Sequence, residues 1–187
     1  PRLGIGLIGS GFMGKAHALG YRVAAQLFDL PFEIDLVCLA DVDDRAAAAA
    51  AARLGFLRST GDWRALLVDP SIQAINITSP NVLHKEMALA ALAAGKHVSC
   101  EKPLAPTPQD CAEMVEAAAR AGRVTQVGFN YLKNPMMALA KQIIDSGEIG
   151  TVVSFRGIHA EDYMADAQVP WSWRLDPAGG GGALADI

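Results

Sequence analysis

The chain has 187 residues, of which 51% are apolar, and its 16 Lys and Arg against 20 Asp and Glu give a formal net charge of −4. A chain of this length and hydrophobicity buries a sizeable core, which excludes an intrinsically disordered protein. The sequence has no basic run of the kind that binds nucleic acid, and no uninterrupted apolar stretch of about 18 residues that would span a membrane.

Short apolar runs alternate along the chain with longer segments that have the apolar period of a helix. The runs predict strands at residues 3–8, 34–40, 74–78, 97–100 and 124–128. The segments between them predict helices at about residues 12–28, 43–54, 81–94 and 107–121. Strands that are apolar on both faces and are joined by helices are typical of a parallel sheet. We therefore expect an α/β fold with a doubly wound parallel sheet, a Rossmann domain, over residues 1–128.

Helix ends are marked by specific residues. Thr107 followed by Pro108 predicts a helix start, with threonine as the N-cap and proline in the first turn. Gly95 and Gly122 follow helical segments and predict helix ends. Trp63 is expected to anchor a short helix to the core.

The pattern changes near residue 130. A helix is predicted at 135–146, a strand at 151–159, and then a loop rich in Trp, Pro and Gly. Residues 129–187 are too few to close an independent core easily, so we expect them to begin a second domain of a longer polypeptide.

Three cysteines, Cys38, Cys100 and Cys111, are too few and too scattered for a disulfide framework or a zinc site. Cys38 and Cys100 lie in apolar runs and are expected to be buried free thiols. We expect no metal site, and a cytoplasmic protein.

A glycine-rich turn, Gly9-Ser10-Gly11-Phe12-Met13-Gly14, follows the first predicted strand and opens a helix. In a dinucleotide-binding turn, the first glycine permits the bend and the second lets a pyrophosphate approach the backbone. The third allows close packing of helix on strand, and the helix start faces the anion. Strand before and helix after favour dinucleotide binding over a purely structural turn.

Asp41 ends the second predicted strand, where a carboxylate accepts hydrogen bonds from the adenosine ribose and repels a 2′-phosphate. The alternative is that Asp41, or Asp43 beside it, caps the following helix. The carboxylate favours NAD, although Arg45 leaves NADP possible.

Other candidate residues follow the later strands, whose carboxyl ends share one edge of a parallel sheet. These groups are Ser79-Pro80-Asn81, Glu101-Lys102-Pro103 and Phe129-Asn130-Tyr131. Beside a cofactor, the Lys102 amine is suited to proton transfer, the alternative being a surface ion pair. A cis Lys102-Pro103 bond would aim that amine. His84 either flanks the nicotinamide or packs at a helix start, and His17 is expected to be structural.

Five phrases occur together and in order along the chain. They are GSGFMG at 9–14, TSPNVLH at 78–84, AGKHVSCEKPLAPT at 94–107, SGEIGTV at 146–152 and PWSWRLDPAGGGGALADI at 170–187. With this combination the chain resembles the Gfo/Idh/MocA oxidoreductase family, which includes glucose–fructose oxidoreductase and inositol dehydrogenases. The resemblance implies a Rossmann domain followed by an α/β domain with a mostly antiparallel sheet, and a homo-oligomer.

The resemblance also implies roles for individual residues. Lys102 is the lysine of the EKP motif, expected to touch both the nicotinamide side and the reacting hydroxyl, and Asp186 is the aspartate that orients the substrate hydroxyl. The positions implied to line the cofactor are Ser79 through His84, Glu101 and Asn130, with Trp173 and Arg174 folding back onto the dinucleotide.

Two departures from the family pattern stand out. The histidine that serves relatives as general base would come four residues after Asp186, beyond Ile187. Leu132-Lys133 stands where many relatives carry an arginine. We expect an NAD(P)-dependent oxidoreductase that transfers hydride between the nicotinamide and a carbinol carbon of a sugar, polyol or inositol, with the chain by itself lacking the full active site. The alternative is a non-catalytic regulatory protein that senses a dinucleotide.

Overall fold

A single parallel sheet of six strands organises the chain in the computed structural model, which describes residues 1–162, 164–176 and 181–182. The strand order is β3-β2-β1-β4-β5-β6. The strands are β1 (Arg2–Ile8), β2 (Glu33–Ala40), β3 (Arg58–Thr60), β4 (Ala74–Ile77), β5 (His97–Cys100) and β6 (Thr125–Val127). The sheet reverses its winding between β1 and β4, which is the point where a doubly wound fold binds its ligand.

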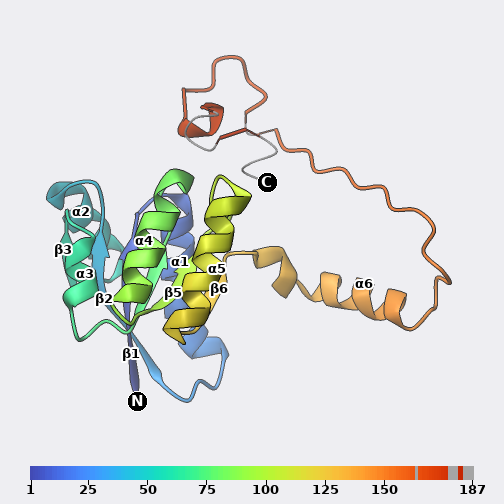
Figure 1. The fold of residues 1–187 in the computed structure, drawn as a ribbon. Helices are drawn as coiled ribbons and strands as arrows, with labels where there is room; N and C mark the ends of the chain where they lie inside the picture. Colours follow the sequence, from blue (N-terminus) through green and yellow to red (C-terminus); the bar gives the residue numbers. More distant parts are fainter. Residues whose placement is uncertain (163, 177–180, 183–187) are drawn as a thin grey trace.

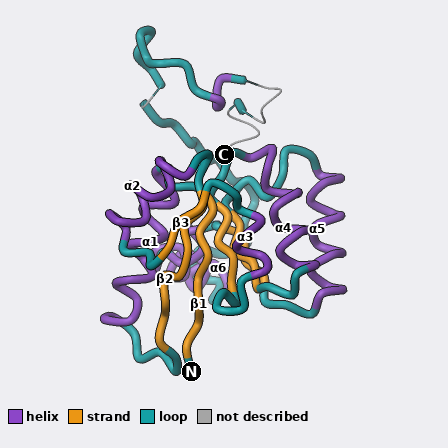
Figure 2. The backbone as a smooth tube through the Cα atoms, turned by 90° about the vertical axis from the view of Figure 1, so that its left-hand side faces the viewer, coloured by secondary structure: helices purple, strands orange, loops and turns teal. Residues whose placement is uncertain are grey.

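Helices connect the strands and cover both faces of the sheet. The helices are α1 (Phe12–Leu27), α2 (Asp44–Leu54), α3 (Arg64–Val68), α4 (His84–Ala93), α5 (Pro108–Ala121) and α6 (Pro135–Asp145). Three short 3₁₀ helices are η1 (Asn81–Leu83), η2 (Asn130–Lys133) and η3 (Trp173–Leu175). Figures 1 and 2 show the sheet between two helical layers, and Figure 1 shows α6 set apart from it.

The core consists of two apolar clusters, one on each face of the sheet. On one face, the alanines Ala47, Ala50 and Ala51 of α2 lie against β-strand side chains that include the fully buried Leu39. Small side chains let α2 approach the sheet closely, so the alanine tract forms part of the core. On the other face, α3, α4 and α5 cover a second cluster that contains Ile75. The expected doubly wound parallel fold is confirmed.

Local sequence signals specify most of the element ends. Thr107 caps α5 by accepting a hydrogen bond from the Asp110 amide, with Pro108 in the first turn. Gly122 ends α5 in the left-handed region, at φ 58°. β3 has no counterpart among the expected strands, because it is only three residues long and polar. Its partner β2 holds it in the sheet.

Residues 151–159 differ from expectation. The predicted strand there is wrong, because these residues form no ladder and are exposed. A strand needs a neighbour to satisfy its backbone hydrogen bonds. Beyond β6, no strand occurs in the part of the chain that the structure describes. The expected helix is present as α6, although it has no buried side chain.

None of the described helices is both long and apolar enough to cross a lipid bilayer.

Lys85 on α4 joins two carboxylates of α5, with its Nζ 2.6 Å from Asp110 Oδ1 and 2.6 Å from Glu113 Oε2. The ammonium hydrogen bonds hold the pKa of both carboxyls below their ordinary values of 3.8 and 4.5. A carboxyl whose pKa is lowered by folding stabilises the native state above its ordinary pKa, and this contribution is lost as the pH falls through the folded pKa.

We therefore expect the melting temperature to fall on acidification below about pH 4.5, and to fall less steeply in Lys85→Met. Calorimetry across this range measures the slope. Lys141→Met is the control, since it removes a pair within one helix, between Lys141 and Asp145 of α6. Equal slopes in wild type and Lys85→Met would contradict the coupling of α4 to α5.

Candidate functional site

A cleft of about 700 Å³ lies along the carboxyl ends of the strands. Its walls come from the turns that follow β1, β2, β4 and β5, with contributions from α3 and α4. The predicted site residues that line it are Gly9, Ser10, Gly11, Phe12, Met13, Asp41, Ser79, Pro80, Asn81, Glu101, Lys102 and Arg174. Residues far apart in the sequence therefore meet at one edge of the sheet, as the parallel topology requires.

Each glycine of the glycine-rich turn has a different structural role. Gly9 adopts a φ of 93°, in the left-handed region that favours glycine. A Cβ on Gly14 would lie 2.1 Å from the carbonyl oxygen of Gly9, so this glycine lets α1 pack against the turn. A Cβ on Gly11 would meet no atom within 4 Å. The second glycine is thus unnecessary for the protein's own packing and keeps open a space that borders the cleft.

The backbone of the turn fits an anionic ligand. Among the described residues, no acceptor engages the amides of Gly11, Phe12 and Met13, at the start of the 16-residue helix α1. These amides and the helix dipole together bind anionic groups. Thr78 fixes the turn from the end of β4, since its hydroxyl donates to the carbonyls of Ile8 (3.0 Å) and Gly9 (2.8 Å). The space at Gly11 and the amides beside it match the pyrophosphate of a dinucleotide.

Asp41 lies next to this turn. Its Oδ2 accepts a hydrogen bond from the Ser10 amide (2.9 Å) and another from the Ser10 hydroxyl, and its Oδ1 accepts from the Val42 amide (2.7 Å). Asp43, by contrast, is the residue that caps α2, through the Ala46 amide. The helix-capping alternative therefore applies to Asp43, and the Asp41 carboxylate borders the cleft.

Ser79 and Lys102 line the cleft from the next two strands along the sheet edge, β4 and β5. Ser79 follows β4, and its buried hydroxyl has no hydrogen-bond partner among the described residues. Lys102 follows β5 and is half-buried. The Lys102-Pro103 bond is cis, as the sequence suggested.

Other predicted site residues lie elsewhere. Gly14 is buried behind the turn, and His84 is fully buried with its ring nitrogens facing backbone carbonyls. Asn130 begins η2, is exposed, and is not among the residues that line the cleft. Trp173 belongs to η3 together with Arg174, and Asp186 lies outside the described residues.

Three residues that the sequence analysis did not assign to the cleft also line it: Trp63, Arg64 and Glu86. Trp63 packs against the core, as expected of a helix anchor, and in addition borders the cleft. The Arg64 guanidinium lies 4.5 Å from the centre of the Trp63 ring, and its Nη2 is 2.7 Å from Glu86 Oε1. Trp63 and Arg64 reach the cleft because β3 and α3 follow β2 in the winding. The signal was the strand–helix alternation itself, which leaves room for one more repeat between residues 54 and 74.

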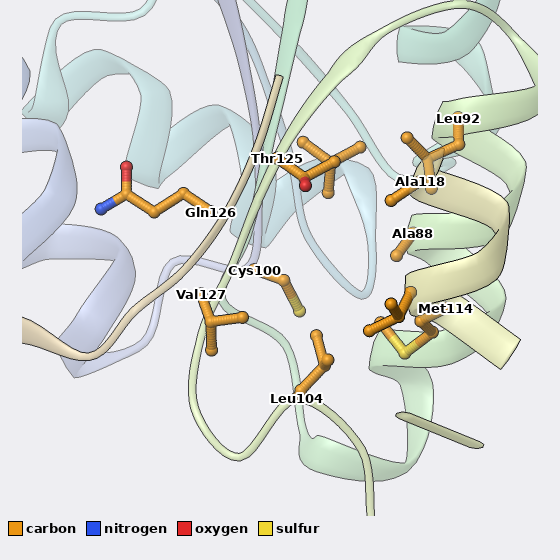
Figure 3. A pocket seen from close by; sticks show the side chains of 11 residues that line it. Ala88, Leu92, Cys100, Leu104, Met114, Ala118, Thr125, Gln126 and Val127 are labelled. Carbon is orange, nitrogen blue, oxygen red and sulfur yellow. The ribbon is translucent and has the colours of Figure 1, made fainter. Parts of the chain in front are cut away.

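A second, smaller cavity lies between α4, α5 and the strands β5 and β6 (Figure 3). Aliphatic side chains and the Cys100 thiol line it, and Gln126 points away from it. Burial raises the pKa of Cys100 to about 12, which keeps this thiol protonated and unreactive. Cys38 and Cys100 are both buried free thiols, as expected. This cavity lacks the converging polar groups of a binding site.

Comparison with known protein families gives two matches. Residues 3–129 match the family model described as "Oxidoreductase family, NAD-binding Rossmann fold", and residues 137–187 match the "GFO/IDH/MocA C-terminal domain". Levoglucosan dehydrogenase of Pseudarthrobacter phenanthrenivorans is 46% identical over 187 residues, covering 99% of this chain and 48% of that protein. Inositol 2-dehydrogenase 2 of Saccharopolyspora erythraea is 37% identical over 165 residues, covering 84% and 45%.

Solved structures give the same picture. Levoglucosan dehydrogenase in complex with NADH and levoglucosan superposes with a TM-score of 0.94 at 45% identity, over 100% of this chain and 51% of that one. An NAD binding oxidoreductase from Klebsiella pneumoniae has a TM-score of 0.92 at 54% identity, over 100% and 50%. The chain spans about half the length of the relatives that it matches.

Proposed function

Because the chain belongs to the GFO/IDH/MocA oxidoreductase family and carries its NAD-binding Rossmann domain, we propose that it binds NAD in the cleft of a sugar or polyol dehydrogenase. One observation carries the proposal: a single cleft joins the open space at Gly11, the Asp41 carboxylate and the Lys102 amine. The first two suit the pyrophosphate and ribose of a dinucleotide, and the third suits a group that moves a proton.

Each end of the cleft has its own task in this reaction. The turn amides and Asp41 bind the adenosine diphosphate part, which orients the ligand along the sheet edge. When bound, the nicotinamide supplies the hydride acceptor or donor. Lys102 follows β5, beyond β4 and Ser79 along the sheet edge, and holds the substrate hydroxyl or exchanges a proton with it. Asp186 is proposed to orient the same hydroxyl.

The proposed substrate is a carbinol carbon of a ring sugar, an anhydrosugar or a polyol. Support comes from the relatives' names, which include levoglucosan dehydrogenase, inositol 2-dehydrogenase and 1,5-anhydro-D-fructose reductase. None of the relatives named here is a regulatory protein, and no observation favours the regulatory alternative.

We place the boundary between the Rossmann domain and the start of a substrate domain at residues 128 and 129, supported by the second family match from residue 137. Exposed apolar side chains on α6, among them Met136, Leu139 and Ile144, support a homo-oligomer or further domain packing there. The free cysteines support a reducing compartment such as the cytoplasm.

The proposal is tested first by binding and then by turnover. NADH fluorescence titration of the chain should give a saturable single site. Levoglucosan, inositol and related polyols are then screened, with NAD and with NADP, for formation of the reduced nicotinamide. Absence of NADH binding would overturn the proposed function.

Replacing Asp41 is expected to change cofactor preference. Asp41→Ser removes the negative charge that repels a 2′-phosphate and the acceptor for the ribose hydroxyls. The ratio of NADPH to NADH affinity should rise by roughly tenfold or more, equivalent to about 1.4 kcal/mol. Fluorescence titration with both nucleotides measures it. Asp43→Ser is the matched control, because serine keeps the cap of α2, and its ratio should stay at the wild-type value. An unchanged ratio of NADPH to NADH affinity in Asp41→Ser would contradict the proposal that Asp41 binds the ribose.

A further inference from the structure

Lys102 lies between two residues that are each contacted by a histidine. Glu101, which precedes it, is contacted by His17 of α1, and Pro103, which follows it, is contacted by His84 of α4. Neither histidine is among the residues that line the cleft. Both therefore act on the segment that carries Lys102 from outside the cleft lining, one through the residue before Lys102 and one through the residue after it.

The first contact fixes the Glu101 carboxylate. His17 Nε2 lies 2.8 Å from Glu101 Oε1, and His17 Nδ1 lies 2.8 Å from the amide nitrogen of Asn76 on β4. Because the Asn76 amide donates to Nδ1, the ring donates from Nε2 to the carboxylate. Glu101 is only 5% exposed. A Cβ on Gly128 would lie 2.3 Å from Glu101 Oε1, so the carboxylate also fills the space that this glycine leaves at the end of β6.

The second contact joins two loops of the cleft. The fully buried ring of His84 has Nδ1 2.9 Å from the Pro103 carbonyl and Nε2 2.9 Å from the Ser79 carbonyl. The ring thus spans the distance between the loop after β4 and the loop after β5. The two ring nitrogens each face one carbonyl, whereas a glutamine has one side-chain nitrogen and so places a nitrogen against one carbonyl only.

We infer that His17 and His84 are positioning residues that set where the Lys102 amine lies in the cleft. His17 acts through the Glu101 side chain, whose Oε2 also accepts from the Lys102 amide (3.2 Å), and His84 acts through the Pro103 carbonyl. The inference rests on the proposed function, since it concerns how Lys102 meets the bound dinucleotide. His84 therefore supports the cleft wall from a buried position, and His17 has a role beyond packing.

Competitive acetylation of lysines, read by peptide mass spectrometry, tests the inference on the chain itself. The rate at Lys102 is referred to the exposed Lys141, with and without saturating NADH. In the wild type, NADH should protect Lys102 by roughly tenfold. In His17→Leu and in His84→Leu, we expect protection to fall below about threefold while the NADH dissociation constant changes by less than about threefold.

Conservative and control variants separate positioning from folding. His17→Gln still donates to Glu101 and should retain the wild-type protection. His84→Gln fills most of the buried volume but reaches one carbonyl only, so it should lose protection even where His84→Leu does not fold. His97→Leu is the matched control, since His97 begins β5 at the end remote from Lys102 and accepts from the Val124 amide there.

The outcomes are distinct. Full protection of Lys102 by NADH in folded His17→Leu and His84→Gln would overturn the inference, although the proposed function would stand. Failure of wild type to bind NADH would overturn the proposed function. In that case the positioning role is tested by the acetylation rate of Lys102 without nucleotide. A change in this rate of roughly threefold or more in both variants supports the role, and a rate equal to that of wild type overturns the role.

Discussion

Replacing Lys102 by alanine should lower kcat by about 10²- to 10⁴-fold while the NADH dissociation constant stays within about threefold of wild type. The reason is the position of Lys102, which follows β5, two strands along the sheet from β1 and three from β2, whose ends carry the glycine-rich turn and Asp41. The turn and Asp41 bind the nucleotide, so its affinity survives. The variant lacks the amine that exchanges a proton with the substrate hydroxyl, so turnover falls.

Steady-state kinetics of the active enzyme, with the polyol or sugar that the screen identifies, measures the change in kcat. Fluorescence titration measures NADH binding in the same preparation. Lys141→Ala is the control, because Lys141 is exposed on α6 and pairs with Asp145 of the same helix. If Lys102→Ala turns over as fast as this control, the catalytic assignment is wrong.

Gly11→Ala and Gly14→Ala should affect different quantities, although both add one methyl group to the same turn. Gly11→Ala should lower NADH affinity, and Gly14→Ala should lower the free energy of unfolding. At Gly11 the methyl group enters open space beside the cleft. We expect NADH affinity to fall by about 10- to 100-fold, which is about 1.4–2.8 kcal/mol, with the free energy of unfolding changed by less than about 1 kcal/mol.

At Gly14 the methyl group would meet the backbone oxygen of Gly9 at 2.1 Å, and backbone cannot rotate away as a side chain does. Alanine gains about 1 kcal/mol in helix propensity over glycine, but the clash costs more than this. The net destabilisation should be about 1–3 kcal/mol.

Denaturant unfolding and NADH titration of both variants test this pair. A Gly20→Ala variant on the same helix is the control, because a Cβ there meets no atom within 4 Å and should affect neither quantity adversely. Wild-type NADH affinity in Gly11→Ala would show that the dinucleotide does not approach the second glycine. A free energy of unfolding in Gly14→Ala equal to that of wild type would show that the backbone of the turn shifts to accommodate the methyl group with little loss of stability.

The sequence carried most of the Rossmann fold because its signals are local. Apolar runs such as that of β1 and caps such as Thr107 act within a few residues of where they stand, and they predicted strands and helices that the structure contains. The same logic failed for β3, whose three polar residues have no strand signal of their own. It also failed for residues 151–159, which have an apolar pattern but no strand beside them.

For the candidate site, the sequence by itself determined the glycine-rich turn, the acidic residue after β2 and the lysine after β5. Strand order then brings these strand ends to one edge, because parallel strands all end on the same side. Only the tertiary structure placed Trp63 and Arg64 in the cleft and put His84 behind its wall. It also paired His17 with Glu101, 84 residues away. Such contacts join residues distant along the chain, and their geometry depends on how helices pack on the sheet, which no local pattern of residues encodes.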